Sequence, residues 1–153
     1  GIVFSFASGY SYMMDARTTW NTITLPLGYM GFGAASGLAL YLLLAAVKKE
    51  SVEAIRLAGV ETVIGGLLAL VFGLAFGFIS GAATGSAAAV FWVAVVCGGV
   101  APLVCGWLGR SKPASAVTVA GIAFAGGIIG SIAFRAVMWM VGTAIANYFG
   151  IVL

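Results

Sequence analysis

The sequence contains no histidine, only four acidic residues and only two cysteines in 153 residues. A haem held by histidine within this chain is therefore excluded, and no cysteine cluster is present that could hold zinc or iron–sulfur. Cys97 and Cys105 lie in one apolar stretch, about 12 Å apart along a helix, which is too far for a disulfide between them. We interpret both as small buried hydrophobic residues.

Charge is scarce as well, since 7% of the residues are charged and 63% are hydrophobic. A soluble domain carries about 25% charged residues, so the composition predicts an all-α integral membrane protein in contact with the lipid bilayer. The net charge of +3 comes from scattered cations that form no basic patch, which argues against nucleic-acid binding. No nucleophile–base pair, P-loop or dinucleotide fingerprint is present, so we assign no catalytic residue and no metal ligand.

Long uncharged stretches predict one polytopic transmembrane helical bundle over residues 1–153. The stretch from Pro26 to Val47 is about 22 residues long, or about 33 Å as a helix, and a hydrocarbon core is about 30 Å thick. Pro26 suits the first turn of this helix, because its missing N–H needs no partner there. The complete predicted spans cover residues 26–47, 57–80, 87–108 and 114–140. Residues 1–14 are too short to cross and are predicted to be the end of a preceding span.

Two local patterns refine this picture. Ser51 is placed to cap the helix that follows the charged segment 48–56, with Glu53 in the first turn at the positive end of the helix dipole. Glycine recurs every four residues at positions 73, 77, 81 and 85, which predicts a smooth stripe where another helix approaches, unless Gly81 and Gly85 belong to the following loop.

The cations are distributed unevenly between the two ends of the predicted bundle. One end, here called the cationic end, holds the connectors 48–56 and 109–113 and most of the lysines and arginines. The other end, here called the tryptophan end after Trp20, holds the connectors 15–25 and 81–86 and the C-terminus. Because cytoplasmic loops are enriched in lysine and arginine, we expect the cationic end in the cytoplasm and the C-terminus outside.

Arg135 is the most informative single residue, because it interrupts an apolar run near the tryptophan end. A cation in such a run is costly unless it snorkels, pairs with an acid or faces a polar cavity. Two interpretations stay open: an arginine that snorkels to headgroups beside Trp139, or a residue that lines a ligand pocket or a partner interface. Asp15 is the only acid at that end and is the candidate counter-ion.

Two segments carry a resemblance to a known family. TWNTITLPLGY at residues 19–29 resembles the segment before the fifth helix of the dimethyl sulfoxide reductase membrane anchor subunit family. AGGIIGSIAFRAVMWMVG at residues 125–142 is similar to the closing helix of the same family. By this comparison the chain holds the end of helix four and helices five to eight of an eight-helix anchor. It departs from the family's usual acid, arginine, tyrosine and histidine at Gly127, Ser131, Arg135 and Met138.

The resemblance implies a subunit of an oxidoreductase complex in a prokaryotic cytoplasmic (inner) membrane. Such an anchor binds and oxidises menaquinol near the outer face in anaerobic respiration. It passes electrons to an iron–sulfur subunit and then to a molybdopterin catalytic subunit, and itself carries no metal or covalent cofactor. The candidate residues for quinol binding or partner contact are Asp15, Arg17, Trp20, Asn21, Tyr29, Arg135 and Trp139.

Two alternatives of other classes stay open. One is a small transporter or channel subunit, in which Arg135 lies on a solute path. It would require broken helices and polar residues at depth, and the middles of the spans have few polar side chains. The other is a purely structural anchor without a ligand.

Overall fold

The computed structural model describes residues 1–142, and this part of the chain is helical without strands. The elements are α1 (Ile2–Tyr10), α2 (Thr24–Val47), α3 (Val52–Ile79), α4 (Ala88–Val95), the π-helical η1 (Val96–Val100), α5 (Ala101–Ser111), the 3-10 turn η2 (Pro113–Ser115) and α6 (Ala116–Gly142). Residues 143–153, on which the expectation of an external C-terminus depends, lie outside the described residues.

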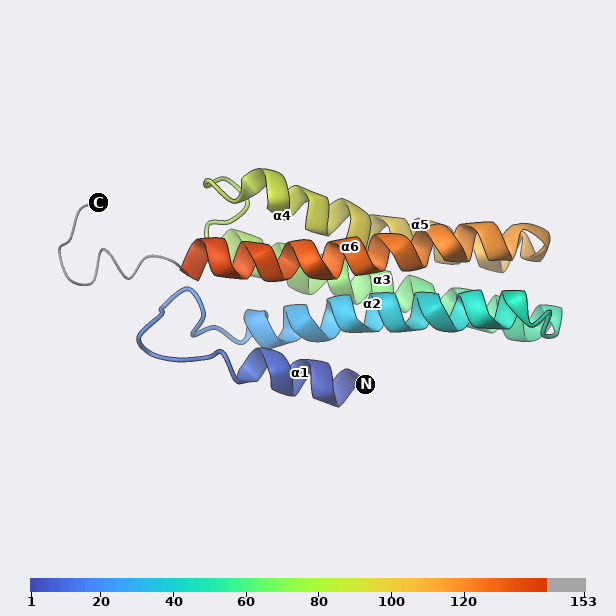
Figure 1. Cartoon of the computed structure of the whole chain (residues 1–153), viewed down its shortest axis with the longest axis horizontal. Coiled ribbons are helices and arrows are strands. Elements are labelled where there is room, and N and C mark those ends of the chain that lie inside the picture. The colour runs from blue at the N-terminus through green and yellow to red at the C-terminus, as the bar shows by residue number, and fades with distance from the viewer. Residues whose placement is uncertain (143–153) are drawn as a thin grey trace.

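Four helical segments are long and apolar enough to cross a membrane. They are Thr24–Val47, Val52–Ile79, Ala88–Ser111 and Pro113–Gly142. The predicted fold class is thereby confirmed, and the chain is a multi-pass membrane protein. The shorter α1 runs antiparallel to α2 along its first half (Figure 1).

The spans form a closed bundle in which α2 packs against α3 and α6, and α5 packs against the same two helices. Figure 1 shows the α1–α2 and α3–α4 connectors at one end and the α2–α3 and α5–α6 turns at the other. The tryptophan end and the cationic end are therefore opposite ends of one bundle. Along the chain, Trp20 and each cationic connector are separated by an odd number of membrane crossings, so these connectors lie at the end opposite Trp20.

The turn between α2 and α3 follows the predicted capping. The Ser51 hydroxyl accepts a hydrogen bond from the Ala54 amide, and Glu53 lies in the first turn, as predicted. The helix begins at Val52, one turn before the predicted start of the membrane-spanning part at Leu57. Because the cap satisfies a backbone amide at the helix end, this end does not have to lie in the membrane, and the charged residues can extend the helix into water.

The start of α2 and the ends of the last two spans also differ slightly from the predictions. α2 begins at Thr24, which places Pro26 later in the same first turn, where its missing N–H is still harmless. α5 continues to Ser111, beyond the predicted end at Leu108. It ends there because Lys112 precedes a proline and is extended, with φ −131° and ψ 75°. The final helix reaches Gly142, two residues beyond the prediction.

The third span contains a π-helical turn that the sequence analysis did not predict. η1 lies between α4 and α5, immediately before Pro102. Proline has no N–H for the ladder, and its ring crowds the carbonyl four residues earlier, here that of Gly98. A widened turn accommodates both effects, and such turns are a recognised cause of irregularity inside long helices. Gly98 also lies directly against Gly130 of α6, so the irregular turn packs closely on this helix.

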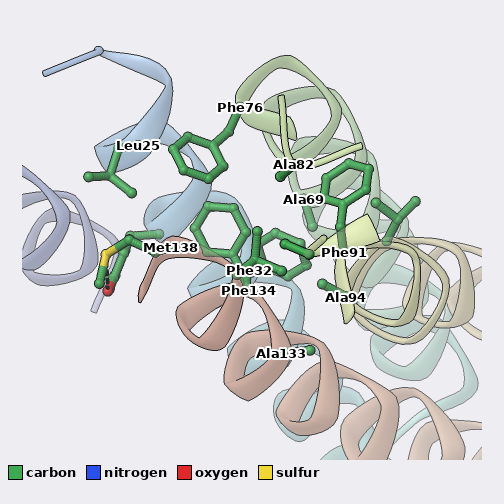
Figure 2. Close-up of a cluster of buried hydrophobic side chains, with 14 of the residues drawn as sticks. Leu25, Phe32, Ala69, Phe76, Ala82, Phe91, Ala94, Ala133, Phe134 and Met138 are labelled. Carbon is green, nitrogen blue, oxygen red and sulfur yellow. Dashed lines mark hydrogen bonds between the residues drawn. The ribbon is translucent and has the colours of Figure 1, made fainter. Parts of the chain in front are cut away.

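The interior differs between the two halves of the bundle. Toward the tryptophan end it is aromatic: the Phe134 ring stacks on Phe32 at 4.7 Å between centroids and meets the edge of Phe76 at 5.2 Å. Figure 2 shows these rings gathered between α2, α3 and α6. Toward the cationic end the buried residues are mostly alanines: Ala45, Ala46, Ala58, Ala116 and Ala120 surround Leu42 and Ile55.

The glycines at 81 and 85 lie in the loop after α3, the second of the two placements expected for them, because α3 ends at Ile79. Gly73 faces the Phe32 ring and Gly77 lies against the Phe91 ring, so both make room for aromatic side chains rather than for a helix backbone. Gly81 lies in the following loop at φ +75°, a conformation that favours glycine.

Candidate functional site

Trp20 fixes the first connector to the last helix at the tryptophan end. Its side chain is 2% exposed, and the indole N–H donates to the Met138 carbonyl at 2.9 Å. The Thr19 hydroxyl donates to the Val141 carbonyl one turn later, at 3.2 Å. Gly142 packs directly against the indole ring of Trp20, and any side-chain carbon at this position would overlap the ring. The sequence therefore joins residues separated by more than 100 positions through hydrogen bonds to the end of α6.

Arg17 and Trp139 complete this contact. The Arg17 guanidinium lies 4.0 Å from the centroid of the Trp20 ring and 5.9 Å from that of Trp139, and the two indoles meet edge to face at 5.1 Å. A cation over an indole face is attracted by about 0.5–2 kcal/mol, depending on how far it is desolvated. Tyr12 packs against both indoles. We call Tyr12, Arg17, Trp20 and Trp139 the aromatic cluster.

Tyr29 connects the aromatic cluster to Arg135. Its ring lies 6.0 Å from Tyr12, and its hydroxyl donates to the Met138 sulfur at 3.3 Å. The Arg135 guanidinium lies 5.6 Å from the centroid of the same ring and is exposed on the outside of the bundle. Arg135 therefore faces outward beside a buried tyrosine, at about 10 Å along α6 from Gly142.

Asp15 does not serve as the counter-ion of Arg135. Its carboxylate accepts a hydrogen bond from the Asn21 side-chain amide at 2.7 Å, within the exposed connector. Within residues 1–142 the structure shows no ion pair between Asp15 and Arg135. The structure thus brings together Arg17, Trp20 and Trp139 in one cluster and Tyr29 with Arg135 beside it, while Asp15 and Asn21 form a separate pair at the surface.

A half-open pocket of about 290 Å³ lies next to Tyr29 and Arg135, between α1, α2 and α6. Its apolar walls are Phe4, Phe32, Gly33, Ile128, Ile132 and Phe134. Its polar groups are the hydroxyls of Ser5, Ser8, Ser36 and Ser131, together with Tyr29 and Arg135. Ligand sites in proteins are typically about 300–1,000 Å³ and combine apolar walls with a few polar groups, so this pocket is at the small end of that range.

The serine hydroxyls of the pocket already donate their protons. Ser8 donates to the Phe4 carbonyl at 2.9 Å and Ser131 to the Gly127 carbonyl at 2.8 Å, each within its own helix. Ser36 donates in the same way to the Phe32 carbonyl at 3.0 Å. A hydroxyl oxygen that has donated its proton still has lone pairs that accept hydrogen bonds. The pocket therefore offers hydrogen-bond acceptors from three helices and one guanidinium donor.

The sequence analysis missed the serines of this pocket. They stand singly in apolar stretches, where an isolated serine usually satisfies its own helix backbone and gives no signal of a site. Only their approach from three helices reveals a polar lining. The spacing of Ser5 and Ser8, one turn apart, could have indicated that this face of residues 1–14 is polar.

The chain matches no protein-family model, and no curated protein or solved structure is similar to it.

Proposed function

We propose that this chain is the membrane anchor subunit of an oxidoreductase complex and that it binds a quinol head group in the pocket between α1, α2 and α6. In this proposal the quinol is menaquinol. Its electrons leave through an iron–sulfur subunit toward a molybdopterin catalytic subunit. The observation that carries the proposal is the pocket, with its apolar walls, hydroxyl acceptors and one guanidinium.

The position of the two family-like segments supports this proposal. Residues 19–29 and 125–142 are distant in the sequence but pack together, through Trp20 on the Met138 carbonyl and Tyr29 on the Met138 sulfur. The same two segments supply Tyr29 and the whole α6 wall of the pocket. A resemblance confined to two segments is more informative when those segments form one site.

The chemistry of the pocket suits a quinol. A quinol head has two hydroxyl groups that donate hydrogen bonds, and the serine oxygens are acceptors. Oxidation releases two electrons and two protons, and negative charge develops on a quinol oxygen as its proton leaves. The Arg135 guanidinium at the pocket would stabilise that charge, since hydrogen bonds to charged groups contribute about 1.5–3 kcal/mol. The isoprenoid tail would lie along the exposed apolar side chains Ile128 and Ile132.

The proposed orientation follows the cations. With Lys48, Lys49, Arg56, Arg110 and Lys112 at one end, that end faces the cytoplasm of a prokaryotic inner membrane. The pocket then lies in the outer half of the bilayer. Partner subunits that accept electrons from it would dock over the aromatic cluster.

The test is binding of a menaquinol analogue to the chain in membranes, measured as a dissociation constant. In Arg135→Gln we expect the dissociation constant to rise about 10-fold or more, because one charge-assisted hydrogen bond is lost. Lys112→Gln is the control, since it removes one cation at the opposite end and should leave the constant unchanged. The side chain of Arg135 is exposed, so the substitution should not prevent folding.

A second substitution tests the pocket itself. Ser131→Leu places a larger apolar side chain in the lining and should abolish analogue binding, while circular dichroism reports an intact helical fold. Unchanged binding in both variants would overturn the proposal. Absence of binding in the unmodified chain would favour a purely structural anchor.

A further inference from the structure

A second groove lies at the cationic end, between the beginning of α3 and the end of α5. It is lined by Val52, Glu53, Arg56, Leu57, Val60 and Arg110. The helices touch below it, because Gly59 lies against the backbone at Gly106 and Arg110. The α2–α3 and α5–α6 turns beside this groove lie at the opposite end of the bundle from the α1–α2 connector (Figure 1). An inference about it is therefore independent of the proposed function.

Two guanidinium groups reach this groove with their donors available. Arg56 and Arg110 are exposed, and among residues 1–142 the structure shows no ion pair or hydrogen bond from either guanidinium. The Arg110 guanidinium lies 5.4 Å from the centroid of the Trp107 ring. Glu53 contributes one carboxylate to the same groove, so the two arginines leave an excess of positive charge.

The depth of the groove matches the boundary between water and lipid. Arg56 is about 6 Å along α3 from its first residue, and Arg110 precedes the last residue of α5. Leu57 and Val60 continue the lining toward the middle of the membrane. Trp107 is half exposed one turn below Arg110, as is typical of an indole at a membrane interface. Cationic groups above apolar side chains match a lipid headgroup above its acyl chains.

We infer that the groove of Arg56 and Arg110 binds the phosphate of an anionic glycerophospholipid. Guanidinium groups bind phosphate oxygens through two parallel hydrogen bonds, and basic pockets between transmembrane helices bind anionic headgroups. The excess positive charge of the groove favours an anionic lipid over a zwitterionic one. In a zwitterionic lipid the positively charged nitrogen of the headgroup would cancel the attraction between the groove and the phosphate. The acyl chains lie over Leu57 and Val60.

The test is a lipid titration of the purified full chain in a non-ionic detergent, followed by native mass spectrometry. Phosphatidylglycerol is the probe, phosphatidylcholine the zwitterionic comparison and sodium phosphate the free-ion comparison. Each cation in contact with an anionic headgroup contributes about 5-fold in affinity, so the double variant Arg56→Gln/Arg110→Gln should bind phosphatidylglycerol about 30-fold more weakly. Each single variant should show about 5-fold weaker binding, which covers the case in which the double variant does not fold.

The control variant is Lys48→Gln/Lys49→Gln, which removes the same charge from the same end but outside the groove. It should retain the affinity and the preference for phosphatidylglycerol. The inference is overturned if the arginine variants bind as the unmodified chain does, or if the lysine variant loses as much affinity. It is also overturned if phosphatidylcholine binds equally well, or if sodium phosphate alone displaces the lipid.

Discussion

Replacing Gly130 by alanine tests the close contact between α6 and the π-helical turn. A side-chain carbon at Gly130 would overlap the backbone of Gly98 in η1, which cannot rotate away as a flexible side chain can. Alanine is favoured over glycine inside a helix by about 1 kcal/mol, while overpacking of an interior costs about 1–3 kcal/mol. Because the obstacle is backbone, we expect the upper part of that cost and a net loss of about 1–2 kcal/mol.

Gly121→Ala on the same helix is the matched control, since nothing lies within 4 Å of a side-chain carbon there. It should leave stability unchanged or raise it by up to about 1 kcal/mol. The assay is unfolding in mixed detergent micelles followed by circular dichroism, with the free energy of unfolding compared between the two variants. If Gly130→Ala were as stable as Gly121→Ala, the packing of α6 against the π-helical turn would be wrong.

Three further changes have defined outcomes. Trp20→Phe removes the donor to the Met138 carbonyl and part of a buried ring, and should lower the free energy of unfolding by about 1–3 kcal/mol in the same detergent assay. Lys49 occupies the left-handed region at φ 55°, so Lys49→Gly should raise stability by about 1 kcal/mol, and a decrease would contradict this reading of the turn. A cysteine at Ser86 should react with a membrane-impermeant maleimide added outside intact cells, and a cysteine at Glu50 should not; the reverse pattern would invert the proposed orientation.

The sequence predicted the spans well because lipid imposes a simple length requirement. About 20 apolar residues are needed to cross, and the charged segment 48–56 and the residues around Lys112 interrupt the apolar runs at clear points. The Ser51 cap was predicted because a hydroxyl residue before a helix is a local signal. The predicted membrane span begins later than α3 itself, because hydropathy marks where a helix meets lipid, whereas the cap marks where the helix begins.

The irregular turn of the third span was not predicted, although Pro102 inside an apolar run, after Gly98 and Gly99, was available as a signal. Whether a proline kinks a helix, ends it or widens one turn depends on what its neighbours can accommodate. Here Gly130 of α6 lies against the widened turn, and that contact is visible only in three dimensions.

The sequence located the candidate residues only as far as one end of the bundle. Trp20 and Trp139 were assigned to the same end by counting crossings, and their edge-to-face contact is visible only in the structure. The partner of Arg135 was predicted wrongly, because Asp15 was chosen as the only acid at that end, while the nearby Asn21 amide satisfies its carboxylate. Counting charges shows which groups lie at the same end of a bundle. It does not show whether a carboxylate there binds a neighbouring amide or a more distant guanidinium.

The most direct test of the account is to find where a quinone contacts the chain. A photoreactive azido-quinone would be added to membranes that hold the full chain, illuminated, and its attachment sites mapped by peptide mass spectrometry. The account predicts labelling of α2 around Gly33 and Ser36 and of α6 between Ile128 and Arg135, with protection by excess menaquinol analogue. Specific labelling only near the cationic end, or labelling that excess analogue does not reduce, would contradict a quinol site between α1, α2 and α6.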